Sequence, residues 1–217
     1  MEFLRFTLVS DGSSDRCLMP ILEWLLHEVG HVKSVDARWA DFSYGAKPRG
    51  LAERLDRALR LYPCDVLFVH RDAEKQNPAL RYEEVAEALA EVSGVSVPPA
   101  VCVIPVRMQE AWLLFDESAI RNAAGNPHGR DGLSLPKLSA IETIPDPKAV
   151  LHGLLRQACG LSGRRLKNFA VAKAALLVTQ YATDFSKLRA LPAFDRLERD
   201  ISTLRDGGWK GVPVAAK

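Results

Sequence analysis

The sequence predicts an α/β fold of the Rossmann-like kind, in which helices flank a parallel sheet and a helical appendage follows. Three observations lead to this prediction. Short apolar segments alternate with segments of helical period through the first half of the chain. The most continuous apolar segment, residues 65–70, is typical of a strand buried on both faces. Three successive β-then-α units require right-handed crossovers, and therefore strands that run parallel.

Composition is consistent with one substantial core. The chain has 217 residues, of which 47% are hydrophobic. No stretch approaches the roughly 20 apolar residues of a membrane span, and the first residues lack the pattern of a signal peptide. We therefore expect a cytoplasmic protein with no membrane association. The four cysteines show neither paired nor metal-ligand spacing, so we expect free thiols.

The first two β–α units are visible in the apolar pattern. Residues 3–10 form a strand that an Asp-Gly turn signal ends, and residues 15–29 carry leucines at helical spacing. Residues 32–42 alternate only partly, which indicates a strand near an edge of the sheet. A helix with an apolar stripe follows between Gly50 and Pro63.

The third unit and the last strand follow the same logic. The buried strand at residues 65–70 leads into an acidic loop and then into an amphipathic helix over residues 82–92. Residues 100–106 form the last core strand, with a proline near its end. These segments place the α/β core at residues 1–123.

The remainder of the chain is predicted to be helical after an irregular stretch. Glycine and proline occupy seven of the 24 positions in residues 124–147, which indicates a loop or hinge. Residues 148–217 contain three helical patterns, with 13 Lys and Arg against 5 Asp and Glu. This basic excess is explained either by solvated helix faces or by a surface that holds a polyanion.

Acidic residues follow three of the predicted strands where each strand ends. They are Asp11 and Asp15 after the first strand, Asp72 and Glu74 after the third, and Glu110 after the last. Because carboxyl ends of parallel strands meet at one edge, these side chains should converge. Like charges that close repel unless a cation intervenes, and Mg²⁺ prefers oxygen ligands. We therefore expect Asp11, Asp72 and Glu74 to bind one or two Mg²⁺ or Mn²⁺ ions.

Several residues next to these carboxylates allow either a functional or a structural interpretation. Gly12 permits a sharp turn, and Asp15 either belongs to the site or only complements the dipole of the following helix. His70 and Arg71 could neutralise developing charge, although a histidine that ends a buried strand is as readily a hydrogen-bonded structural residue. Glu110 lies either in the site or on the surface.

These motifs resemble a known family. The order of strand, acidic Gly turn, helix and acid-ended strand resembles the TOPRIM domain of topoisomerases, primases and overcoming-lysogenization-defect nucleases. Asp11-Gly12-Ser13-Ser14-Asp15, with Gln-Glu-Ala-Trp-Leu-Leu-Phe-Asp at residues 109–116, is more closely similar to an uncharacterised TOPRIM-like bacterial family. Residues 146–148 and 188–194 resemble its C-terminal part. The resemblance implies that Asp11, Asp72, Glu74 and Glu110 carry the chemistry.

Two positions depart from the pattern of this family. Asp11 stands where Glu is usual, and Glu74 stands where Asp is usual. Each change moves a carboxylate by about one methylene, and mispositioning by about 1 Å can cost on the order of 100-fold in rate. Reduced or absent catalysis therefore stays open as an alternative.

The expected function is Mg²⁺-dependent hydrolysis of phosphodiester bonds in nucleic acid, by a nuclease that the resemblance connects with ATPases and phage defence. A non-catalytic or weakly catalytic partner of an ATPase, and a metal-dependent nucleotide hydrolase, are the alternatives. We expect the nucleic-acid backbone, of DNA or RNA, to contact basic residues of the tail: Arg164, Arg165 and Lys167.

Overall fold

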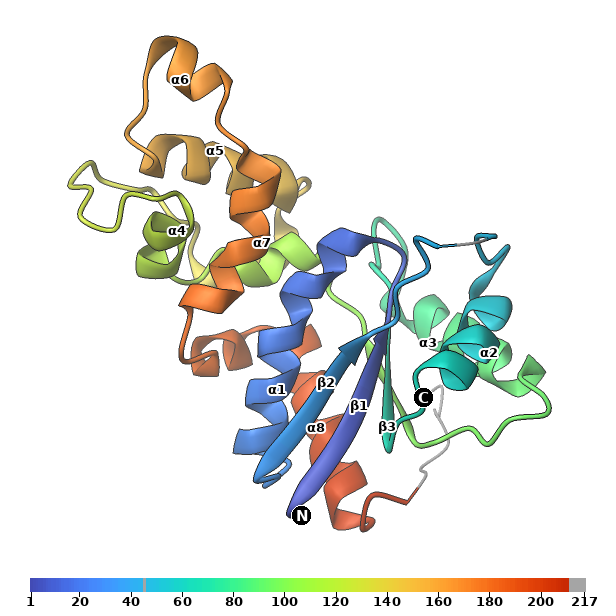
Figure 1. The fold of residues 1–217 in the computed structure, drawn as a ribbon. Coiled ribbons are helices and arrows are strands. Elements are labelled where there is room, and N and C mark those ends of the chain that lie inside the picture. The colour runs from blue at the N-terminus through green and yellow to red at the C-terminus, as the bar shows by residue number, and fades with distance from the viewer. Residues whose placement is uncertain (45, 211–217) are drawn as a thin grey trace.

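The centre of the molecule is a parallel sheet of four strands in the order β2-β1-β3-β4. The computed structural model describes residues 1–44 and 46–210. The strands are β1 (Phe3–Val9), β2 (Ser34–Trp39), β3 (Val66–His70) and β4 (Ala100–Val103) (Figure 1). In the register of the sheet, Phe6 of β1 is aligned with Ala37 of β2 and with Val66 of β3. The predicted α/β class is confirmed.

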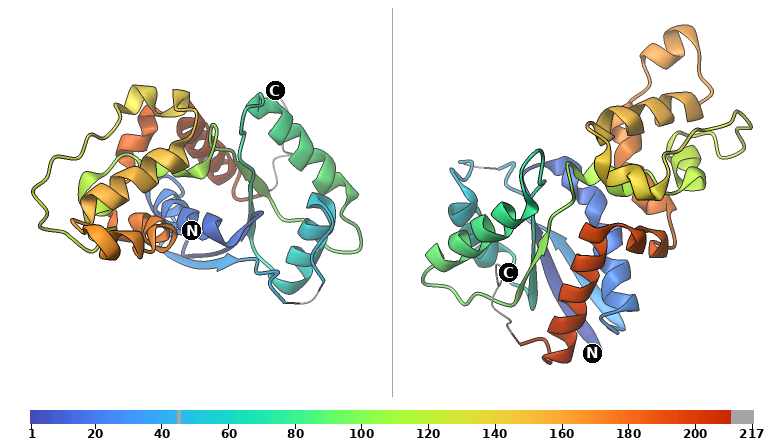
Figure 2. Two further views of the ribbon diagram at one scale, coloured as in Figure 1. Left: turned by 90° about the horizontal axis from the view of Figure 1, so that it is seen from above. Right: turned by 180° about the vertical axis from the view of Figure 1, so that it is seen from behind.

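Helices cover both faces of the sheet. On one face lie α1 (Met19–Glu28) and α8 (Pro192–Asp206), and on the other lie α2 (Leu51–Leu61) and α3 (Pro78–Glu91) (Figures 1 and 2). Alternation along the strands supplies both cores, because Phe6 and Phe68 face α1 while Leu67 and Val69 face the α2 and α3 side. Phe6 and Phe68 meet edge to face, with ring centroids 5.2 Å apart.

Burial of the strands agrees with the sequence pattern. All five residues of β3 are buried, whereas β2 is only half-buried and forms one edge of the sheet. The helix expected from Asp15 begins as a turn of 3-10 helix, η1 (Ser13–Leu18), before α1. The sequence pattern therefore predicted the order of the elements, and the structure refines their ends.

The segment that was expected to be a loop or hinge is fixed to the core. Between α4 (Glu117–Ala123) and α5 (Pro147–Ala158), the structure has one short 3-10 helix, η3 (Leu138–Thr143). Ile141 of η3 is fully buried in the same hydrophobic core as α1 and the sheet. This segment is irregular, but it is anchored.

The helical C-terminal region divides into two parts. An outer part contains α5, α6 (Gly163–Lys167) and α7 (Val171–Tyr181), which rise beyond the sheet (Figures 1 and 2). One helix was expected over residues 166–181; the structure breaks it, and Phe169 in the break packs against the core. After η4 (Ser186–Ala190), α8 returns to the sheet, and its Phe194 is fully buried against Trp112.

The described helices include none with the length and apolar character needed to cross a bilayer.

Candidate functional site

A cavity of about 340 Å³ lies where the carboxyl ends of β1 and β3 meet. The chain crosses from β1 to β2 on one side and then to β3 and β4 on the other, so this position is the topological switch point of the sheet. Ligands of open α/β sheets bind in the crevice at such points. The cavity is lined by residues of both strand ends and of α3: Asp11, Gly12, Ser14, Asp15, His70, Arg71, Asp72, Glu74 and Arg81.

The structure thus brings together the residues predicted after the first and third strands. At the centre, the side chain of His70 is 3% exposed and lies between two carboxylates. Its Nδ1 is 3.4 Å from Oδ2 of Asp15, and its Nε2 is 3.2 Å from Oδ1 of Asp72. Burial alone would lower the pKa of His70, but the hydrogen bonds and charges of both aspartates outweigh it and raise the pKa to about 9. His70 is therefore a buried cation at neutral pH.

Asp15 is a buried partner of this cation, which decides between its two readings. It is 5% exposed, its Oδ2 accepts the Gly12 backbone N–H at 3.0 Å, and its Oδ1 accepts the Ser14 hydroxyl at 3.0 Å. Burial acts to raise the pKa of Asp15, and the interaction with His70 more than reverses this, so the pKa lies well below its usual value. Asp15 fixes the loop after β1 to the end of β3.

Asp72 presents one oxygen to the protein and leaves the other available. Oδ1 accepts the backbone N–H of Gln109 at 2.9 Å and contacts His70. Within the described part of the chain, Oδ2 of Asp72 has no hydrogen bond, and this residue lines the cavity. Oδ2 is therefore the atom through which Asp72 can bind a ligand.

Glu74 is held by its backbone rather than by its side chain. Its φ of 53° lies in the left-handed region, as does the φ of 67° at Arg107, to whose carbonyl the Glu74 N–H donates at 2.9 Å. Such conformations are uncommon outside glycine and concentrate at functional sites. The Glu74 carboxylate forms no ion pair with any residue in the ranges 1–44 and 46–210.

Two arginines that the sequence interpretation missed complete the site. Arg54 is the fourth residue of α2 and lies 3.5 Å from Asp11, which also pairs with Arg71. Arg81 is the fourth residue of α3 and donates to the carbonyl of Asp72 at 3.1 Å. Helices of β–α units begin at the carboxyl edge of the sheet. An arginine in the first turn of each helix was therefore the available signal.

Arg71 and Arg81 are ordered by a shared carboxylate of α3. Glu84 accepts from Arg71 at 2.7 Å and from Arg81 at 2.8 Å. Because Arg71 also reaches Asp11, the loop after β1, the loop after β3 and α3 are connected by charged groups. Both carboxylates and guanidinium groups thus line the cavity.

The donors of this cavity are carboxylate oxygens, the kind of ligand that Mg²⁺ prefers, but they do not form a preformed cage. In the parts of the chain that the structure describes, no three His, Cys, Asp or Glu side chains gather closely enough to hold a metal. Asp15 is committed to His70, but Asp72 Oδ2 and the Glu74 carboxylate are available oxygen donors on one cavity. Mg²⁺ commonly binds through one or two carboxylates and keeps several waters, and this pair provides that donor set.

Glu110 is not in this cavity. Its side chain is 8% exposed and lies 3.3 Å from Lys148, where it lines a separate cavity of about 40 Å³ with His152. The 3-10 helix η2 (Gln109–Leu113) turns the Gln109 N–H toward Asp72 and leads Glu110 away. Ser14 lines both cavities. The catalytic role of Glu110 stays a prediction of the resemblance.

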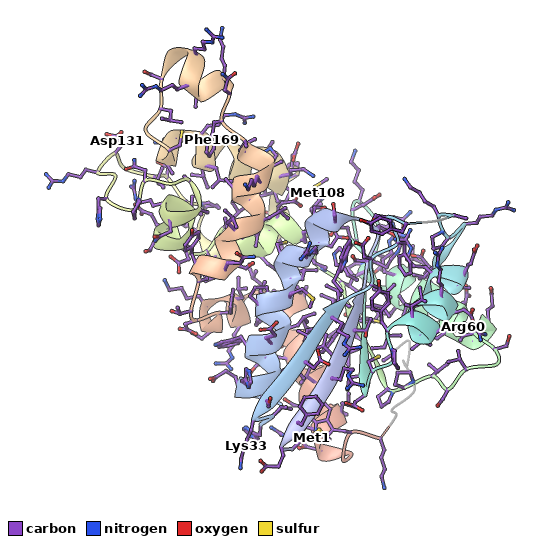
Figure 3. All side chains as sticks on the ribbon, in the orientation of Figure 1. Met1, Lys33, Arg60, Met108, Asp131 and Phe169 are labelled. Atoms are coloured by element: carbon purple, nitrogen blue, oxygen red, sulfur yellow. The ribbon has the colours of Figure 1, made fainter. Side chains whose placement is uncertain are left out.

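The predicted backbone-binding residues lie apart from the cavity. Arg164, Arg165 and Lys167 are exposed on α6, in the outer helical part that also contains Phe169 (Figure 3). None of the three lines the cavity at the switch point. All four cysteines are free, as expected.

Comparisons with protein-family models, curated proteins and solved structures gave no match to this chain.

Proposed function

We propose that this protein is a metal-dependent nuclease of the TOPRIM type, which hydrolyses phosphodiester bonds in nucleic acid. The observation that carries the proposal is the convergence of Asp11, Asp72 and Glu74 with Arg71 and Arg81 on one cavity at the switch point. Phosphoryl transfer uses carboxylates that bind a hard cation, and it uses guanidinium groups nearby that bind the phosphate.

Each group has a distinct role in this proposal. Asp72 Oδ2 and Glu74 would hold Mg²⁺ or Mn²⁺, with Asp11 as a third carboxylate ligand from the same cavity. The metal, when bound, supplies Lewis-acid polarisation of the phosphate and a water of lowered pKa. Arg71 and Arg81 orient the phosphate and neutralise its developing charge, and His70 holds Asp72 in place.

Two cationic residues on α5, Lys148 and Arg156, support a polyanionic substrate. Lys148, His152 and Arg156 follow one another at four-residue spacing, so they lie along one side of the helix. Burial lowers the pKa of His152, and the charges of Arg156 and Lys148 lower it further, which indicates local positive potential. This row begins beside Ser14 at the acidic cavity, and the chain leads from its end to α6 with Arg164 and Arg165. A nucleic-acid backbone could follow it.

Ion pairing in the site favours a second candidate, a non-catalytic or weakly catalytic partner of an ATPase. Asp11 already has cationic partners in Arg71 and Arg54, so metal binding must displace them. Nucleotide hydrolysis is a third candidate, because about 340 Å³ lies in the range of small-molecule sites. A role in anti-phage defence belongs to the proposal through the resemblance alone, and a cytoplasmic location belongs to it through the sequence pattern.

The test is incubation of the pure full chain with labelled DNA and RNA, in Mg²⁺, in Mn²⁺ and in chelator. We expect metal-dependent cleavage that Asp72→Asn lowers by at least roughly 100-fold. Asp56→Asn is the matched control, since Asp56 pairs with Arg60 on the outer side of α2, and it should cleave normally. Cleavage that persists in chelator, or in Asp72→Asn, would contradict the mechanism.

The alternatives give different results in the same experiment. A nucleotide hydrolase would release phosphate from nucleoside triphosphates while leaving both polymers intact. A non-catalytic partner would cut neither substrate, and it would be retained by an ATPase without any requirement for metal.

A further inference from the structure

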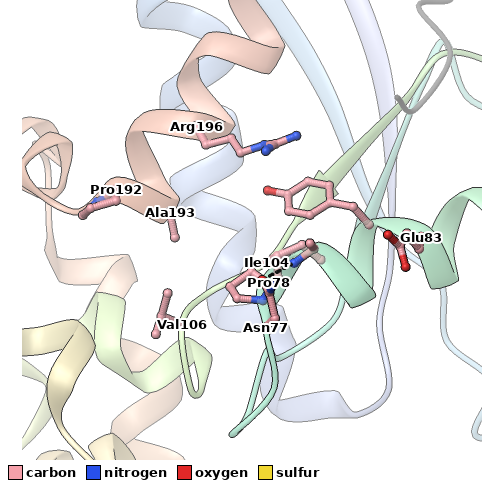
Figure 4. A pocket seen from close by; sticks show the side chains of 10 residues that line it. Asn77, Pro78, Glu83, Ile104, Val106, Pro192, Ala193 and Arg196 are labelled. Carbon is pink, nitrogen blue, oxygen red and sulfur yellow. Dashed lines mark hydrogen bonds between the residues drawn. The ribbon is translucent and has the colours of Figure 1, made fainter. Parts of the chain in front are cut away.

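A second cavity, of about 380 Å³, lies between α3, α8 and the chain that follows β4 (Figure 4). It shares no lining residue with the acidic cavity. Its walls are largely apolar side chains from the starts of both helices and from the end of the strand: Pro78, Ala79, Ile104, Val106, Pro192 and Ala193. Both its volume and its apolar walls are typical of a small-molecule site.

Few polar groups line this cavity. Arg196 of α8 lies with its guanidinium 4.1 Å from the centre of the Tyr82 ring. Its Nε is buried without a hydrogen bond, and it forms a long ion pair, of 3.8 Å, with Asp200 one helical turn further along α8. Tyr82 is 6% exposed as a whole residue, and it lines the cavity. A guanidinium whose Nε lacks a hydrogen bond is thus stacked on the Tyr82 ring at this cavity.

The local field in the cavity favours an anion. Helices α3 and α8, of 14 and 15 residues, both begin here, and the N-terminus of a helix carries partial positive charge. Asn77 accepts the Ala79 N–H of α3, and Glu142 accepts the Ala193 N–H of α8, so Arg196 is the group that remains for an anion. Glu83, the one carboxylate that lines this cavity, is exposed to solvent at its mouth. Stacking on Tyr82 holds the Arg196 guanidinium in one plane, which suits it to a carboxylate, sulfonate or phosphate.

We propose that this cavity binds a small ligand with a planar apolar body and a single anionic group. The body lies between the two helix starts and the residues that follow β4, and the anion binds Arg196. Tyr82 donates its hydroxyl to the same ligand. This site is independent of the proposed nuclease activity, because none of its residues lines the acidic cavity.

The experiment uses anilinonaphthalene sulfonate, an apolar aromatic anion whose fluorescence rises on binding, titrated against the folded full chain. We expect one saturable site. Arg196→Met should weaken binding by roughly 10- to 100-fold, as loss of a charge-assisted hydrogen bond does. Arg199→Met is the control on the same helix and should bind as the native protein does, because Arg199 pairs with Asp195 and lies outside the cavity.

A third variant tests the location independently of charge. Ala193→Phe places a ring in the cavity and should abolish binding, while thermal unfolding shows whether each variant is folded. Amide NMR of the native protein should show perturbation at residues 77–83, 104–106 and 192–196. Equal affinity of the native protein, Arg196→Met and Ala193→Phe, or perturbation centred elsewhere, would overturn the proposal.

Discussion

Replacing His70 with glutamine should remove a pH dependence of stability that the native protein shows above neutral pH. His70 is a buried cation between Asp15 and Asp72, and both aspartates act to favour its protonated form. The interaction raises its pKa from 6.5 to about 9. The protonated imidazole is therefore stabilised in the folded protein relative to the unfolded chain.

The direction and the size of this change in unfolding free energy follow from the pKa of His70 in the unfolded chain and in the folded protein. A raised pKa gives a contribution that is complete below the unfolded value of 6.5 and is lost as the pH rises through about 9. A shift of this size corresponds to about 3 kcal/mol of unfolding free energy. We expect the native protein to lose about this much between about pH 6 and pH 9, beyond what the variant loses. The buried thiols titrate in both proteins, so their effect cancels in the difference.

Urea unfolding followed by tryptophan fluorescence at several pH values measures this difference. Glutamine leaves the buried Asp15 and the partly exposed Asp72 without this counter-ion, so the variant should be less stable by roughly 3 kcal/mol near neutral pH. Adding Asp15→Asn removes one of these charges and should recover part of the loss. His128→Gln, at an exposed histidine, is the matched control and should follow the native pH profile. Parallel profiles for native protein and His70→Gln from about pH 6 to pH 9 would refute the interpretation of His70 as a buried cation.

Two further changes test the outer helices and the attachment of α8. Replacing Arg164, Arg165 and Lys167 with glutamine should weaken nucleic-acid binding. It should also reduce the slope of log affinity against log salt concentration by about two to three. An unchanged slope would show that α6 is not part of the interface. Phe194→Ala should lower the unfolding free energy by about 3–5 kcal/mol in a urea titration, because Phe194 is fully buried against Trp112. A loss below about 1 kcal/mol would contradict the packing of α8 in the main core.

The sequence predicted those parts of the fold that local pattern determines. The five-residue β3 was recognisable because a strand buried on both faces is continuously apolar. An aspartate just before a helical segment is a typical N-cap, and the Asp116 side chain accepts the Ala119 N–H at 3.0 Å at the start of α4. The return of α8 to the sheet was not predictable, because it depends on contacts such as Phe194 with Trp112, which are far apart in the sequence.

The same distinction applies to the candidate site. That Asp11, Asp72 and Glu74 share a cavity could be predicted, because parallel strands bring their carboxyl ends to one edge. The position of Glu110 depends on the direction in which η2 leaves the strand, and no local pattern specifies that direction. The partnership of His70 with Asp15 depends on β1 and β3 being neighbours, which became evident only from the strand order.

Burial divides the carboxylates of the site into fixed and exchangeable groups. Asp15 is held by a buried histidine, and separating a buried ion pair costs several kcal/mol, so Asp15 will keep this partner when a ligand binds. Asp11 is 54% exposed beside Arg71, and an exposed ion pair contributes at most about 1 kcal/mol. A divalent cation or a phosphate can therefore separate Asp11 from Arg71 at small cost. Their exchange would give the Asp11 carboxylate to a cation and the Arg71 guanidinium to a phosphate, so the ion pair is compatible with a site that binds both.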